Sequence, residues 1–166
     1  MTDPITIRAA TLHDVPEVLG FIRELATYEG LTQQVQASEA DLAAALFSAR
    51  PHAEVIFACL EGKPVGFALF FHNFSTFTGK PGIYLEDLFV RPEARGRGVG
   101  KRLLTWLART TLERGGARLD WAVLDWNAPS IGFYRSLGAV PQDAWTTMRV
   151  TGAALERLAA EPAGPG

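Results

Sequence analysis

Apolar side chains recur every three to four positions over residues 15–26, a spacing that predicts one apolar face on a helix. The positions concerned are Val15, Val18, Leu19, Ile22, Leu25 and Ala26. Asp14 and Glu17 stand three residues apart, as in a capping box, and Pro16 falls in the first turn, where its missing N–H is harmless. Gly30 follows the last apolar position. We therefore expect a helix from Asp14 to Gly30.

Four further helices are predicted. Ser38–Phe47 begins with Ser38 as N-cap and has Asp41 at the third position, and Gly98–Arg114 has an apolar stripe that ends at a Gly-Gly pair. Ala128–Gly138 also ends at a glycine, and Thr151 is a suitable cap for a short C-terminal helix.

Runs of apolar, β-branched and aromatic residues predict six strands. They are Ile5–Ala10, Glu54–Glu61, Val65–Phe74, Gly82–Val90, Ala117–Leu124 and Ala144–Val150. Hairpin connections alternate with helical crossovers, so we expect an α/β (α+β) fold with a mixed, mostly antiparallel sheet flanked by helices. One domain is expected over residues 1–160, with a disordered tail at 161–166.

Composition narrows the function. The 166 residues are 48% apolar with a net charge of −2, and no apolar run reaches the length of a membrane span. The single cysteine, Cys59, sits in an apolar run and the three histidines are scattered, so neither a disulfide nor a metal site is expected. These features favour a cytoplasmic protein without nucleic-acid or membrane partners.

The junction "VRPEARGRGVGKRLL" (Val90–Leu104) concentrates basic residues and glycines between a strand and a helix. Glycines let an anion approach the backbone, and the N-terminus of the following helix attracts negative charge. We expect Arg95 and Arg97 near the anion, and Arg91 and Arg102 in solvent. The sequence fits neither a Walker loop nor a dinucleotide fingerprint, and a solvated turn or a nucleic-acid patch is less favoured.

Within this junction, "RGRGVG" resembles the pyrophosphate loop of the GCN5-related N-acetyltransferases (GNATs), which bind acetyl-CoA. The motifs "FIRELATYE", "YLEDLFV", "RGRGVGKRLL" and "FYRSLGA", in this order, further resemble the diamine (spermidine/spermine-type) N-acetyltransferase branch. The resemblance spans almost the whole chain. It implies the GNAT fold, acetyl-CoA as co-substrate, a small amine as acceptor, and a homodimer.

The resemblance also assigns roles to two residues. Tyr134 corresponds to the family's general acid, since a phenol can protonate a departing thiolate. Glu86 faces the amine in the family, where a carboxylate acting through water can deprotonate an alkylammonium ion. Strand alternation places Glu86 with Tyr84 and Leu88, and Asp87 on the opposite face with Leu85 and Phe89.

The remaining predicted site residues follow from the same resemblance. Acetyl-CoA is expected on Leu88, Phe89, Val90, Arg95, Gly96, Arg97, Gly98, Val99, Gly100, Lys101, Asn127, Ala128, Pro129 and Ser130. The amine is expected on Tyr28, Glu29, Glu86, Asp87, Asp120, Trp121 and Asp143. The acids among them would form a channel suited to a polycation, although Asp120 and Asp143 are equally consistent with ordinary surface residues.

The resemblance therefore implies an enzyme that transfers acetyl from acetyl-CoA to a di- or polyamine, directly and in a ternary complex. Phe77 and Asp125 depart from the polyamine pattern, and a thialysine-like amino acid is an alternative acceptor. Acetylation of a protein lysine or N-terminus is another alternative. A non-catalytic acyl-CoA sensor is the last, and the presence of both Glu86 and Tyr134 argues against it.

Overall fold

The computed structural model describes residues 5–162, so most of the predicted tail lies outside the described residues. Helices and strands follow the predicted order, except that no strand forms at residues 144–150. The elements are β1 (Thr6–Ala9), α1 (Val15–Glu29), α2 (Glu39–Phe47), β2 (Glu54–Leu60), β3 (Lys63–Ser75), β4 (Lys80–Val90), α3 (Val99–Glu113), β5 (Leu119–Trp121), α4 (Ala128–Ser136) and α5 (Gly152–Ala160). Three short 3₁₀ turns, at Leu12–Asp14, Thr32–Gln34 and Pro92–Ala94, join them.

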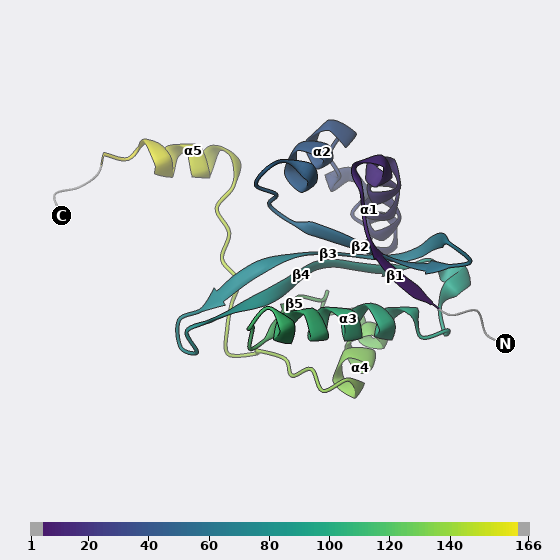
Figure 1. Cartoon of the computed structure of the whole chain (residues 1–166). Coiled ribbons are helices and arrows are strands. Elements are labelled where there is room, and N and C mark those ends of the chain that lie inside the picture. Colours follow the sequence, from purple (N-terminus) through teal and green to yellow (C-terminus); the bar gives the residue numbers. More distant parts are fainter. Residues whose placement is uncertain (1–4, 163–166) are drawn as a thin grey trace. The chain divides into compact units, whose positions relative to one another are not determined.

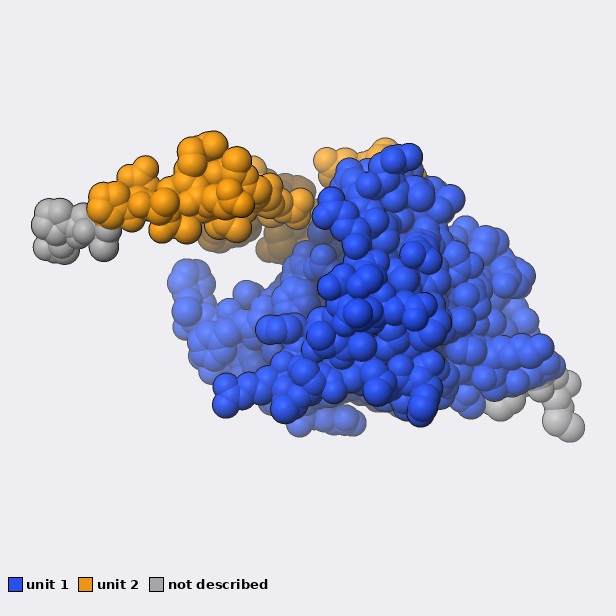
Figure 2. Space-filling view, turned by 90° about the horizontal axis from the view of Figure 1, so that it is seen from above, with its two compact units in different colours: residues 1–122 blue, residues 123–166 orange. Residues whose placement is uncertain are grey.

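The chain divides between Ala122 and Val123 into two compact units, which Figure 2 shows in blue and orange. The first unit contains all the described strands together with α1, α2 and α3, and the second contains α4 and α5.

The five strands of the first unit form one sheet in the order β1-β2-β3-β4-β5. The first three pairings are antiparallel, and β4 pairs with β5 in parallel. Helices α1 and α2 cover one face of this sheet and α3 covers the other (Figure 1). The predicted mixed, mostly antiparallel sheet with flanking helices is thus confirmed.

Three phenylalanines form the centre of the core beneath α1. Phe21 of α1 stacks on Phe67 of β3 with ring centroids 5.0 Å apart, and it contacts Phe57 of β2 at 5.7 Å. All three side chains are fully buried. Burying an aromatic side chain of this size stabilises a fold by about 2–3 kcal/mol, so this cluster fixes α1 on the sheet.

On the opposite face, Gly66 of β3 lets α3 approach the sheet closely. A Cβ atom at Gly66 would lie 3.0 Å from Cγ1 of Val99 and 3.3 Å from the carbonyl oxygen of Phe89. Val99 is the first residue of α3 and is buried. The packing at Gly66 therefore sets how closely the first turn of α3 approaches the sheet.

Of the caps predicted for the first two helices, one is confirmed and the other is wrong. Ser38 caps α2 as predicted, because its hydroxyl accepts the N–H of Asp41. The capping box predicted between Asp14 and Glu17 is wrong. Asp14 instead accepts the N–H of Thr11 at 2.8 Å and pairs with Arg8 at 2.7 Å, so it closes the 3₁₀ turn before α1. The Arg8 guanidinium holds the pKa of the Asp14 carboxyl well below its usual range.

The strand predicted at Ala144–Val150 is also wrong. These residues form no strand, and their side chains are exposed, Trp145 at 79%. Alternating polarity produces a strand only where a neighbouring edge supplies backbone hydrogen bonds, and the described part of the second unit contains no strand that could supply such an edge. The predicted strand at Ala117–Leu124 shortens to Leu119–Trp121. The last helix does follow Thr151, as predicted.

Candidate active site

A β-bulge interrupts β4 at its two carboxylates. Leu69 of β3 pairs with Asp87, whereas the next residue, Phe70, pairs with Leu85, so Glu86 is left without a partner in the register. Paired residues point to the same face of a sheet, and consecutive residues of β3 point to opposite faces. Asp87 and Leu85 therefore lie on opposite faces.

This bulge corrects the predicted alternation. Asp87 shares a face with Phe89, as expected, but not with Leu85, because one extra residue shifts the register by one position. Glu86 sits at the bulge and is exposed, so simple alternation no longer determines its direction. The alternation of residues along this strand does not indicate that one residue is inserted at the bulge.

Three carboxyl groups lie close enough at the bulge for their charges to interact. Asp87 is half-buried, and burial together with the charges of Glu86 and Glu29 raises the pKa of Asp87 to about 6. Glu29 ends α1, and partial burial raises its pKa as well. Carboxylates that repel one another out of water gain stability when a cation lies between them. The cluster Glu29, Glu86 and Asp87 is therefore suited to binding an ammonium group.

Tyr28, the other predicted substrate residue of α1, lies beside Phe89 with ring centroids 6.3 Å apart. The guanidinium carbon of Arg95 lies over both rings, 5.2 Å from the centroid of Tyr28 and 5.4 Å from that of Phe89. Its Nε donates to the carbonyl oxygen of Val90 at 2.9 Å. Arg95 thus folds back from the glycine-rich loop toward the end of α1.

The loop after β4 has the geometry of an anion site. Gly96 and Gly98 adopt φ angles of +73° and +82°, and nothing lies within 4 Å of the position that a Cβ atom would take on either. L side chains rarely adopt such angles, so glycine is required here. Helix α3 begins at Val99, directly after the loop, and Arg97 and Lys101 are exposed. These features fit the pyrophosphate of acetyl-CoA.

The prediction that Arg91 is solvated is wrong. Its guanidinium pairs with Glu17 at 2.9 Å and Glu24 at 3.1 Å, lies 4.2 Å over the ring of Phe21, and donates to the carbonyl oxygen of Pro64. Its side chain is 23% exposed. Its three partners on α1 are Glu17, Phe21 and Glu24, which are four and then three residues apart. This spacing places them on one helix face, and it is the signal that the sequence offers for the contact. The expectation for Arg102 is confirmed, since that residue is exposed.

Asp120 and Trp121 lie on the short strand β5. Asp120 is opposite Tyr84 in the register, pairs with Arg118 at 3.0 Å, and accepts a hydrogen bond from Asn73 Nδ2 at 3.1 Å. Burial and the charges of Glu86 and Asp120 raise the pKa of Tyr84. Asp120 is thus already paired with the cation of Arg118, which lies just before β5, while Trp121 is half-buried.

The second unit contains the other predicted site residues. Asn127 caps α4, because its side-chain oxygen accepts the N–H of Ser130 at 3.3 Å, which confirms the predicted cap. Tyr134 is half-buried in α4, and its ring lies 5.6 Å from that of Phe133. Asp143 is exposed. Tyr134 and Glu86 belong to different units, so their juxtaposition stays a prediction.

Comparison with known proteins identifies the family. The model of the acetyltransferase (GNAT) family matches residues 20–139, a range that includes the last two thirds of α1, the bulge, the glycine-rich loop and α4. The chain belongs to the GNAT family. It is therefore an acetyltransferase.

Relatives of this acetyltransferase share most of its length. The thialysine N-epsilon-acetyltransferase of Sus scrofa is 37% identical over 166 residues, covering 93% of this chain and 97% of the relative. The L-ornithine N5-acetyltransferase of Arabidopsis thaliana is 32% identical and covers 92% of this chain and 86% of the relative. A human spermidine/spermine N(1)-acetyltransferase-like protein is also 32% identical over 89% of this chain, which corresponds to 22% of that protein.

Solved structures support the fold of the acetyltransferase. An integron cassette protein of V. cholerae superposes with a TM-score of 0.79 at 32% identity, covering 95% of this chain and 98% of that one. An aminoglycoside acetyltransferase from a soil metagenome superposes with a TM-score of 0.74 at 21% identity, covering 89% and 95%, and this likeness shows the fold alone.

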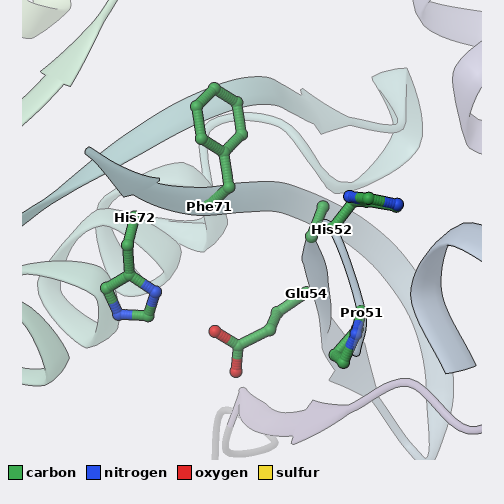
Figure 3. A pocket seen from close by; sticks show the side chains of 6 residues that line it. Pro51, His52, Glu54, Phe71 and His72 are labelled. Carbon is green, nitrogen blue, oxygen red and sulfur yellow. The ribbon is translucent and has the colours of Figure 1, made fainter. Parts of the chain in front are cut away.

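A cavity of about 300 Å³ lies elsewhere on the first unit of the acetyltransferase. It is lined by Pro51, His52, Ala53, Glu54, Phe71 and His72. Figure 3 shows that Glu54 and His72 come from neighbouring strands, and Arg114 joins them, 2.6 Å from Glu54 and 3.1 Å from Nε2 of His72. None of the predicted site residues lines this cavity, so it is not the candidate active site.

Two further findings concern residues 5–162 of the acetyltransferase. No three or more His, Cys, Asp or Glu side chains in this range are placed to hold a metal ion. Over the same range, no helix combines the length and apolar character needed to cross a membrane.

Proposed function

We propose that this acetyltransferase transfers the acetyl group of acetyl-CoA to a primary amine of a small di- or polyamine, or of an amino acid such as thialysine. The carboxyl cluster of Glu29, Glu86 and Asp87 is the single observation that best supports a cationic acceptor. Asp87, the last member of this cluster on β4, lies three residues before the anion-binding junction at Val90, so donor and acceptor sites adjoin along β4.

Acetyl-CoA is assigned to the glycine-rich loop and the end of β4. Backbone N–H groups from Arg97 to Lys101, at the start of α3, would hold the pyrophosphate. The backbone of Leu88, Phe89 and Val90 would bind the pantetheine as a strand edge does, and an N–H there would polarise the thioester carbonyl. Asn127, Ala128, Pro129 and Ser130, at the start of α4, are assigned to the same co-substrate.

Glu86 is assigned as the general base. An alkylammonium ion must lose a proton before its nitrogen can attack the thioester carbonyl carbon. The exposed position of Glu86 at the bulge supports proton acceptance through a water molecule, while Asp87 and Glu29 hold the cation in place. The C–N bond then forms in a ternary complex, without a covalent intermediate on the enzyme.

Tyr134 is assigned as the general acid. When the tetrahedral carbon collapses, the C–S bond breaks and the electron pair leaves with the sulfur of CoA. A phenol within hydrogen-bond reach supplies the proton that completes the thiol. The half-buried position of Tyr134 in α4, behind the Asn127 cap, supports a fixed orientation for this group.

The choice among amines rests on the relatives. Those named above act on thialysine and on L-ornithine, and one is like a spermidine/spermine N(1)-acetyltransferase. The shared chemistry is a primary alkylamine with a second cationic nitrogen. We rank thialysine and other diamino acids beside di- and polyamines, because Asp120 is already paired with Arg118 and Asp143 is exposed, which leaves Glu29 and Asp87 for the second nitrogen.

Three broader expectations belong to this proposal. A homodimer is proposed from the family resemblance, and sedimentation or light scattering measures it directly. Location in the cytoplasm and a single functional domain over residues 1–160 stay predictions.

A thiol-release assay tests the proposal. Acetyl-CoA is supplied with spermidine, putrescine, thialysine, L-ornithine, L-lysine and a basic peptide in parallel, and free CoA is measured. Release with one or more small amines, and none above background with the peptide, is the expected result. Tight binding of acetyl-CoA without release for any amine would instead identify a sensor. A preference for the peptide would identify a protein acetyltransferase.

A further inference from the structure

Two loop arginines dock on a single stripe of α1. The stripe consists of Glu17, Phe21, Glu24 and Tyr28. These positions are four, three and four residues apart, so they share one helix face. Arg91 contacts the first three, and Arg95 contacts the last. The two arginines bracket the 3₁₀ turn that leads from β4 into the glycine-rich loop.

The contacts of the two arginines differ in kind. Arg91 is tied by two carboxylates, an aromatic ring and the Pro64 carbonyl, and it fixes the turn to α1. Arg95 is exposed, and it makes one hydrogen bond, to the Val90 carbonyl oxygen, and lies over two ring faces. Arg95 is also the first residue of the loop itself. It is therefore the more easily displaced of the two links between the loop and α1.

We infer that Arg95 is a positioning residue that couples the acetyl-CoA loop to the amine-binding end of α1, so that each substrate raises the affinity for the other. This inference rests on the proposed function. Pyrophosphate on the loop would order Arg95, the first residue of the loop, and the Arg95 guanidinium would thereby hold the Tyr28 ring against Phe89. Glu29 follows Tyr28 directly and is placed with it.

Coupling also runs in the opposite direction. An amine held by Glu29 and Tyr28 would favour the arrangement in which Arg95 lies over Tyr28, and that arrangement fixes the first residue of the loop. Thermodynamic linkage requires the two effects on affinity to be equal. Because a lysine keeps the charge but has neither the planar guanidinium nor an Nε donor, Arg95→Lys separates this link from simple attraction to the pyrophosphate.

The first test measures the coupling. Titration calorimetry gives the Kd of CoA without and with a saturating amine, chosen as the one with the highest turnover in the thiol-release panel. We expect the amine to lower this Kd by about tenfold in the wild type, within the usual range of such couplings. Arg95→Lys should reduce that effect to less than about twofold. An unchanged ratio in Arg95→Lys would overturn the inference. Arg102→Gln, which removes an exposed arginine of α3, is the matched control.

The second test needs no amine. The chain has three tyrosines, so ¹³C-tyrosine labelling gives three ring signals, and Tyr28→Phe identifies that of Tyr28. The probe is 3′-phosphoadenosine 5′-diphosphate, the nucleotide half of CoA, which fills the loop but lacks the pantetheine. It should shift the Tyr28 signal in the wild type and in Arg102→Gln. In Arg95→Lys it should bind with an affinity within about threefold, because the charge is kept, but leave Tyr28 unmoved.

The outcomes distinguish this inference from the proposed function. An equal Tyr28 shift in the wild type and in Arg95→Lys overturns the coupling while acetyl transfer stands. The coupling is also overturned if the wild type releases thiol from acetyl-CoA but its Tyr28 signal does not shift when the nucleotide binds. Failure of the wild type to bind either CoA or the nucleotide refutes the proposed function, and the coupling with it.

Discussion

Glu29 ends α1 and Asp87 lies at the bulge of β4, yet the charge of Glu29 contributes to holding the pKa of Asp87 at about 6. Burial is the largest cause of that shift, and the charge of Glu86 is the second. The fold thus keeps carboxyl groups from two elements near one another, and no basic group lowers the pKa of Asp87. A substrate cation would relieve this repulsion.

The first prediction concerns the pH dependence of amine binding. The ionised form of Asp87 attracts an ammonium group, and its pKa of about 6 means that this form is lost as the pH falls below 6. The KM for the amine should therefore rise by several-fold between pH 7 and pH 5.5, while the KM for acetyl-CoA changes little. Asp87→Asn should raise the KM for the amine at pH 7 and flatten its pH dependence. Steady-state kinetics at both pH values measure this, and equal slopes in the two proteins would contradict it.

The second prediction concerns stability. Because the pKa of Asp87 is raised on folding, the folded state binds a proton more tightly than the unfolded state, and stability falls as the pH rises from about 4 to about 6. Asp87→Asn removes the buried charge. We expect it to increase the free energy of unfolding at pH 7.5 by about 1–3 kcal/mol. Urea denaturation at pH 4 and pH 7.5 should show this gain only at the higher pH; a gain of equal size at both would assign it to another cause.

The third prediction addresses Glu86. Without a carboxylate base, attack depends on amine that solvent has already deprotonated, and alkylamines have pKa values near 10. Glu86→Gln should lower kcat at pH 7 by about 10²–10⁴-fold and move the rising limb of the rate profile to higher pH. Acetyl-CoA affinity should be unchanged. An unshifted profile would remove Glu86 from the role of base.

Some of this site could be predicted from the sequence and some could not. The glycine-rich loop, the cap at Asn127 and the helix that begins at Val99 follow local rules of backbone geometry, so their residues identify them. The bulge at Glu86 depends on how β3 and β4 align. The pattern of one strand does not contain that alignment.

The contacts of Arg91 are a second feature that the sequence did not predict. A basic residue beside a turn is usually solvated, and its partners lie 67 to 74 positions earlier in the chain, on α1. Only the packing of that helix on the sheet brings Glu17 and Glu24 to it. The strand expected at Ala144–Val150 failed for the related reason that an alternating segment needs a partner edge as well as a pattern.

The fourth prediction addresses Tyr134. Removing its hydroxyl leaves the departing thiolate without an acid, whereas the ring and its packing on Phe133 are kept. Tyr134→Phe should therefore lower kcat by about 10²-fold or more and change the Kd of acetyl-CoA by less than about threefold. Calorimetry and thiol release measure the two quantities. Unchanged turnover, or a loss explained by weaker acetyl-CoA binding, would contradict the role of acid.

The fifth prediction links the core to the co-substrate. A Cβ atom at Gly66 would lie 3.0 Å from Val99 Cγ1 and 3.3 Å from Leu103 Cδ1 and the Phe89 carbonyl oxygen. Gly66→Ala should lower the free energy of unfolding by about 1–3 kcal/mol, as overpacking does. Because Val99 starts α3, the helix N-terminus should shift away from the sheet and raise the KM for acetyl-CoA.

Gly20 of α1 provides the matched control for this change. Nothing lies within 4 Å of the position that a Cβ atom would take there, so Gly20→Ala should stabilise the protein by about 0.5–1 kcal/mol through helix propensity. Its KM for acetyl-CoA should equal that of the wild type. If Gly66→Ala were as stable as Gly20→Ala, the close approach of α3 would not limit the packing, and the N-terminus of this helix would not be set by Gly66.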